Sequence, residues 1–173
     1  NRLLIPGLLA KRFAARSVDL SAVSESSRAE LPGGVLSRER DAVERFKKTA
    51  LGTLGAAVRT FGPTLPDEQE VLLHCADLLI DVYAAESVIL RAAAAASSQL
   101  SALHADVAEV FVHDASLRIA SSARQALSAT LSGKDLSESL KTVAESLQPD
   151  PLNTTAGRRR IADETVKRGS YPF

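Results

Sequence analysis

Apolar residues recur every three or four positions along most of the chain, and this spacing predicts α-helices with one buried face. The clearest segment runs from residue 37 to residue 61, and charged residues occupy its opposite side. Gly62 and Pro63 predict its end. The apolar face of this segment is formed by Val43, Phe46, Ala50, Leu54, Val58 and Phe61.

A second segment begins around Pro66 and is apolar around most of its circumference between residues 71 and 90, with an alanine run at 92–96. Such a pattern predicts burial between several neighbours, so we expect this helix to be the central element. Further helices are predicted at about 101–131, after the capping-box pair Asp135 and Glu138, and at about 154–167. No strand or repeat is recognisable. We therefore predict an all-α fold, an antiparallel up-down helical bundle with four main helices plus short terminal helices.

The first 36 residues differ from the rest of the chain. Residues 1–16 are predicted to be the end of a helix from a preceding, missing domain, interrupted by Pro6 and Gly7. Residues 17–36 carry too few apolar side chains to offset their ordering entropy, so a mobile loop is expected there, followed by the bundle at 37–173. Because the chain opens at Asn1 and contains no Met, we expect it to be a piece of a longer protein.

Composition excludes several classes of function. Lys plus Arg equals Asp plus Glu at 21 each, so no net charge would attract nucleic acid or an anionic membrane. Cys75 is the single cysteine, which rules out an internal disulfide and favours a reducing, cytoplasmic location. No apolar run approaches the roughly 20 residues of a membrane-spanning helix. The basic run 158–160 is expected to be solvated or paired with Asp163 and Glu164.

Two Glu–His pairs at a spacing of four were considered as metal ligands in the bundle. Glu70 and His74 lie on one predicted helix, and Glu109 and His113 lie on the next. The usual di-metal bundle instead spaces Glu and His by three and adds a Glu from each of two more helices. We therefore favour ordinary exposed helical pairs over a metal site.

A polar stripe interrupts the apolar second helix: Glu70, His74, Asp77 and Asp81. The favoured interpretation is a solvent-facing or salt-bridged edge. The alternative makes Asp77 or Asp81 a buried structural partner of Arg118 or Arg124. No glycine-rich phosphate loop, nucleophile elbow or metal motif is present, so no catalytic, cofactor-binding or metal-binding residue is predicted in this chain.

Several short motifs, in order, carry a resemblance. Asn1 to Gly7 resembles the stretch that directly follows the Glu-Gly-Thr segment bearing the catalytic base in acyl-CoA dehydrogenases, a segment absent here. Further on, the motifs Ala76-Asp77, Ile80-Asp81-Val82-Tyr83 and Leu90-Arg91-Ala92 look like the long helix of the very-long-chain branch. The end of the chain, from Arg168-Gly169 to Tyr171-Pro172-Phe173, is similar to the terminus of that branch.

This resemblance implies a non-catalytic accessory helical domain of an FAD-dependent enzyme of fatty acid β-oxidation. Its implied partners are the catalytic domain of the same chain, a fatty acyl-CoA and an electron-transfer flavoprotein, and a homodimer is left open. The branch is also associated with membrane-surface attachment. The first segment is the candidate contact with the catalytic body, which we favour, or with a membrane: Leu3, Leu4, Ile5, Leu8, Leu9, Lys11 and Arg12. A free-standing adaptor bundle is the alternative function.

Overall fold

The computed structural model describes residues 2–14 and 36–171, and helices are the only regular secondary structure in these ranges. The predicted loop at 17–36 therefore lies, apart from Leu36, outside the described residues. The elements in chain order are α1 (Leu4–Ala14), α2 (Ser37–Phe61), the 3-10 helix η2 (Gly62–Asp67), α3 (Gln69–Ala94), α4 (Ser101–Thr130), α5 (Gly133–Ser146) and α6 (Thr154–Arg168).

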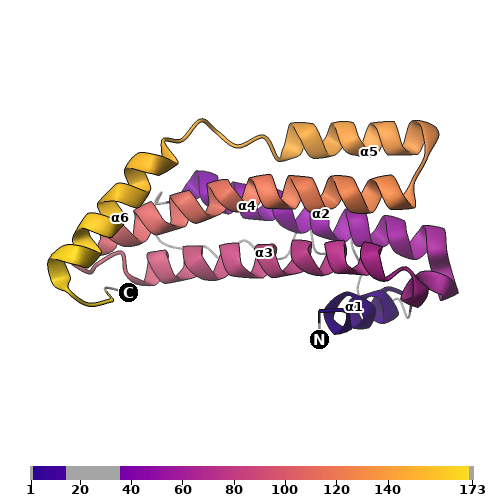
Figure 1. Ribbon diagram of the computed structural model, residues 1–173, viewed down its shortest axis with the longest axis horizontal. Helices are drawn as coiled ribbons and strands as arrows, with labels where there is room; N and C mark the ends of the chain where they lie inside the picture. The colour runs from indigo at the N-terminus through magenta and orange to yellow at the C-terminus, as the bar shows by residue number, and fades with distance from the viewer. Residues whose placement is uncertain (1, 15–35, 172–173) are drawn as a thin grey trace.

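Helices α2, α3, α4 and α5 run alternately up and down, α6 crosses one end of the bundle, and α1 lies against α3 near the other end (Figure 1). The predicted antiparallel bundle with four main helices and shorter terminal helices is therefore confirmed. Among the described residues, α2, α3, α5 and α6 all pack on α4, and α1, α2, α4 and η2 pack on α3. The second long helix is buried between several neighbours as expected, although α3 also keeps an exposed outer side.

The core follows the apolar spacing of the sequence. In α2, Val43, Phe46, Ala50 and Leu54 are all buried, as the recurrence at three and four residues predicts. The main cluster joins the first three of these residues to Leu78 of α3 and to buried residues of α4 and α5. Leu54 belongs to a second cluster, which fills the end of the bundle where α1 lies. A buried leucine contributes roughly 1.5–3 kcal/mol, so these clusters account for most of the driving force for folding.

The helix ends differ in part from the predictions. Gly62 and Gly169 have the positive φ values of 50° and 64° that end α2 and α6 as expected. Pro66, however, lies inside η2, and α3 begins only at Gln69. The fifth helix begins at Gly133, before the predicted capping pair.

The first helix is also different from the prediction. It runs without a break from Leu4, after a turn at residues 2–3, to Ala14. Pro6 is buried at its third position, where a backbone amide has no partner within the helix in any case. Pro6 and Gly7 therefore do not interrupt it.

Candidate functional site

Helix α1 has apolar side chains on two opposite sides, and only one of these sides is covered. Leu3, Leu9 and Ala10 pack on the second core cluster, together with the buried Pro6. On the other side, the exposed fractions of Leu4, Ile5 and Leu8 are 61%, 48% and 59%. We call these three residues the α1 outer face. The seven residues predicted to contact the catalytic body or a membrane thus lie on different sides of α1. Leu3 and Leu9 face the bundle, whereas Lys11 and Arg12 are exposed.

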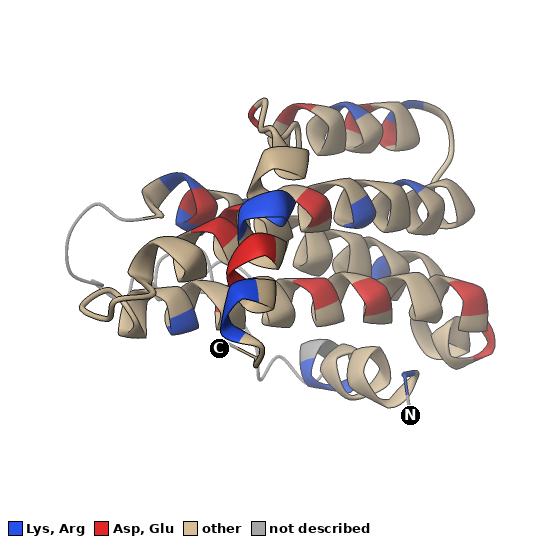
Figure 2. Cartoon of the chain, turned by 60° about the vertical axis from the view of Figure 1, so that its left-hand side comes forward, with Lys and Arg blue, Asp and Glu red and all other residues tan. Residues whose placement is uncertain are grey.

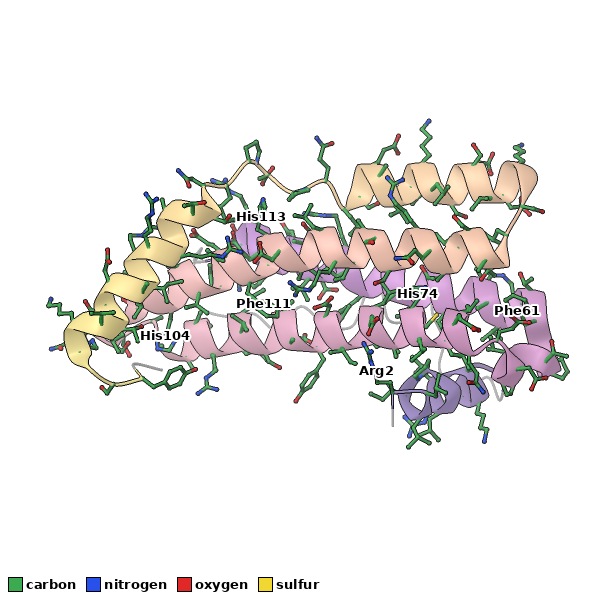
Figure 3. All side chains as sticks on the ribbon, in the orientation of Figure 1. Arg2, Phe61, His74, His104, Phe111 and His113 are labelled. Carbon is green, nitrogen blue, oxygen red and sulfur yellow. The ribbon has the colours of Figure 1, made fainter. Side chains whose placement is uncertain are left out.

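Helix α1 is held to the bundle by charge as well as by packing. Arg2, just before the helix, forms an ion pair with Asp77 of α3, and Figure 3 shows the Arg2 side chain beside that helix. The Arg2 side chain is more than half exposed, so the pair adds little stability and serves mainly to orient α1. The α1 outer face is consequently presented from a fixed position on the bundle.

The predicted polar stripe is divided among different partners. Asp77 pairs with Arg2, and Asp81 receives hydrogen bonds from both Nε and Nη2 of Arg118 at 3.1 and 2.7 Å. Only 16% of the Asp81 side chain is exposed, and this contact raises the pKa of Arg118. Glu70 is exposed and His74 is half-buried. The Arg118 pair corresponds to the structural alternative considered for Asp81.

Arg118 also contacts an aromatic ring of its own helix, α4. Its guanidinium carbon lies 5.3 Å from the centroid of the Phe111 ring, within the range of a cation–π contact. The role of this arginine is therefore structural, because its donors and its flat face are both engaged within the bundle.

The two Glu–His pairs are not assembled into a metal centre in the described part of the chain. No group of three or more His, Cys, Asp or Glu side chains lies there in positions suited to a metal ion. His113 Nδ1 is buried without a hydrogen-bond partner, and the carboxylate oxygen of Asp114 lies 3.6 Å away. The pKa of Glu109 is raised by burial and by the nearby carboxylates of Glu39 and Asp106.

The basic run at 158–160 has partners other than those predicted. Arg158 pairs with Asp114 and Arg160 with Asp106, both on α4, whereas Glu164 pairs with Arg168. Figure 2 shows basic and acidic positions side by side where α6 crosses α4. The expectation of pairing with Asp163 and Glu164 was wrong, because partners from a distant helix cannot be read from local spacing.

An outer side of α3 was missed by the sequence analysis. Leu73, Ile80, Tyr83 and Leu90 have exposed fractions of 37%, 41%, 76% and 47%. The sequence analysis expected the apolar positions of this helix to be buried between neighbours and only its polar stripe to face solvent. Within the described residues, no helix is both long enough and apolar enough to span a membrane.

Comparison with known proteins identifies relatives of the whole bundle. Residues 45–144, more than half of the chain, match the family described as "Acyl-CoA dehydrogenase, C-terminal domain". A "Probable acyl-CoA dehydrogenase" of Bacillus subtilis (strain 168) is 32% identical over 182 residues, covering 99% of this chain and 31% of that protein. An acyl-CoA dehydrogenase complexed with FAD from Bacillus anthracis superposes with a TM-score of 0.86 at 25% identity, again over 99% of this chain and 31% of the other. The chain thus spans about a third of the length of these relatives.

Proposed function

Since the chain belongs to the acyl-CoA dehydrogenase C-terminal domain family, we propose that it is the non-catalytic helical domain of an FAD-dependent acyl-CoA dehydrogenase. The similar protein from Bacillus anthracis is complexed with FAD, which supports FAD as the cofactor of the parent. In such an enzyme a base would take a proton from the α carbon of a fatty acyl-CoA, and the bound flavin would accept a hydride from the β carbon. The base for this reaction and the flavin site are assigned to the part of the parent that lies outside this chain.

The α1 outer face carries the structural part of the proposal. Leu4, Ile5 and Leu8 expose apolar surface at the very start of the chain, where any preceding polypeptide would be attached. A tether holds its two ends at high effective concentration, so a preceding domain would dock most readily beside residue 2. We therefore assign the α1 outer face to contact with the catalytic part of the same chain.

Lipid contact is the competing role for this surface. Lys11 and Arg12 are exposed on the same helix, and basic residues beside an apolar face are typical of interfacial helices. With three exposed apolar residues the face is small, and its position beside the attachment point favours the catalytic body.

Liposome co-sedimentation of the full-length protein separates the two roles. The unmodified protein is compared with a triple Leu4→Ser, Ile5→Ser, Leu8→Ser variant. Unchanged liposome binding removes the lipid role.

The activity itself is tested on the full-length protein. We expect bound flavin with its visible absorbance, and acyl-CoA-dependent reduction of an artificial electron acceptor. An acyl-chain-length series tests assignment to the very-long-chain branch, and addition of electron-transfer flavoprotein tests that partner. A full-length protein with neither flavin nor acyl-CoA-dependent reduction would instead support the adaptor bundle. The homodimer and the cytoplasmic location stay predictions.

A further inference from the structure

A groove runs along the bundle between α2 and α5. Helix α5 packs on α4 but lies apart from α2, and the space between them has a volume of about 670 Å³. The floor of the groove consists of buried, mostly apolar residues: Thr53, Ala56, Leu127 and Val143. The groove is therefore elongated, apolar at its base and open to solvent along its length.

The charges on the groove walls are unevenly placed. Helices α2 and α5 run in opposite directions (Figure 1), so Arg45 and Lys48 of α2 lie at the same end as Ser146. At the other end, Arg59 accompanies Asp135 and Glu138, and Glu138 Oε1 also lies 3.5 Å from Lys134 Nζ.

The three cations on the α2 wall, Arg45, Lys48 and Arg59, are all exposed and form no ion pair within the described ranges. One end of the groove is consequently cationic, and the other end is close to neutral.

Gly52 provides an independent indication of an occupant. It lies exposed in the middle of α2 and lines the groove, and its φ is not positive. An added Cβ would meet nothing within 4 Å, so neither packing nor backbone geometry requires glycine here. Because glycine weakens a helix relative to alanine, a molecule lying close to the α2 backbone would explain its presence.

We propose that this groove binds a long-chain amphiphilic anion. The acyl chain lies on the floor beside Gly52, and the anionic head group is held by Arg45 and Lys48. Arg45 and Ser146 also line an adjoining hollow of about 360 Å³, but its lining includes the carboxylates of Glu39, Glu109 and Asp150. The head group is therefore assigned to the groove side of Arg45 and Lys48 and not to this hollow. The inference rests on the groove alone and does not depend on the proposed parent enzyme.

Photo-cross-linking of the full-length protein with a diazirine-bearing palmitate analogue tests the proposal, because peptide mapping separates this groove from any other acyl site. We expect cross-links on residues 45–60 and 135–146. The double variant Arg45→Glu, Lys48→Glu should weaken apparent affinity by at least about tenfold, because losing one charge-assisted contact already has this effect and the variant reverses two cations. Gly52→Leu should abolish these cross-links by filling the groove, while Arg91→Glu, on α3 and outside the groove, serves as the control.

Competition identifies the source of the head group. Displacement by palmitate at lower concentration than by palmitoyl-CoA indicates a fatty acid anion, and displacement by palmitoyl-CoA at lower concentration than by palmitate indicates an acyl thioester. Displacement by CoA alone contradicts an acyl-chain site. Cross-links outside the groove, or cross-links unchanged in both the charge-reversal and Gly52→Leu variants, overturn the proposal. If Gly52→Leu fails to fold, as judged by circular dichroism, the charge-reversal variant and its Arg91→Glu control decide the outcome.

Discussion

The close packing of α6 on α4 can be tested with a single substitution, because it depends on one glycine. Gly157 is buried on α6, and an added Cβ there would lie 2.8 Å from Val110 Cγ2 of α4. Real Cβ atoms do not approach this closely, and the β-branched Val110 has little rotamer freedom to move aside. Gly157→Ala must therefore push α6 away from α4 or displace the valine.

The expected change in the free energy of unfolding of Gly157→Ala follows from two opposing effects. Overpacking of this kind typically destabilises by about 1–3 kcal/mol, whereas replacing a helical glycine by alanine stabilises by about 0.5–1 kcal/mol. Gly52→Ala is the matched control, since its added Cβ meets nothing within 4 Å. The helix-propensity gain largely cancels between the two variants. The free energy of unfolding of Gly157→Ala should consequently lie about 1–3 kcal/mol below that of Gly52→Ala.

Urea denaturation followed by circular dichroism measures both variants, and hydrogen exchange of the α6 amides shows whether the loss is local. We expect Gly52→Ala to be more stable than the unmodified chain and Gly157→Ala to exchange faster in α6. The double variant Gly157→Ala, Val110→Ala should recover part of the loss by removing the clashing methyl group. If Gly157→Ala stabilises the chain as much as Gly52→Ala does, the close approach of α6 to α4 is refuted.

Three further predictions concern buried groups. Leu78→Ala removes a side chain with no exposed surface and should lower the free energy of unfolding in urea by about 2–5 kcal/mol. Burial raises the pKa of Cys75 to about 12, so its thiol should resist alkylation at pH 8 until the chain unfolds. Because the thiol ionises at lower pH in the unfolded chain than in the folded one, the free energy of unfolding should also fall as pH rises above about 9. Burial and the carboxylates of Glu39 and Asp106 raise the pKa of Glu109, so ionisation of Glu109 disfavours the folded state. The contribution of Glu109 to the free energy of unfolding therefore declines as pH rises through the raised pKa. Glu109→Gln should therefore raise Tm at pH 7 and change Tm less at a pH below the ordinary glutamate pKa. An equal change in Tm at the two pH values would show that ionisation of Glu109 is not the cause.

Much of the fold was predictable because periodicity is local information. The apolar face of α2 and its end at Gly62 were read from residue spacing, since a helix buries the positions that recur every three or four residues. The start of α3 was placed too early at Pro66, because proline suits the first turn of both helix types and the sequence does not separate a 3-10 turn from an α-helix.

The site was harder to predict, because it depends on contacts between distant segments. Spacing placed Asp81 on a polar stripe and suggested Arg118 as a partner, but it did not indicate that Asp77 pairs with Arg2. The partners of Arg158 and Arg160 on α4 were likewise beyond local patterns. The groove between α2 and α5 arises because α5 lies away from α2, which no property of either helix alone reveals.

The central claim, that the α1 outer face is covered by the rest of its own polypeptide, is tested most directly by alkylation of introduced cysteines. The variants Leu8→Cys and Val166→Cys are each prepared in this chain and in the full-length protein. In this chain the exposed fractions of Leu8 and Val166 are 59% and 81%, and the native Cys75 is buried. We predict that both introduced thiols react readily in this chain, and that in the full-length protein Leu8→Cys alone slows, by about tenfold or more, as expected for a docked surface that opens rarely. Equal reactivity of Leu8→Cys in the two proteins would contradict the account.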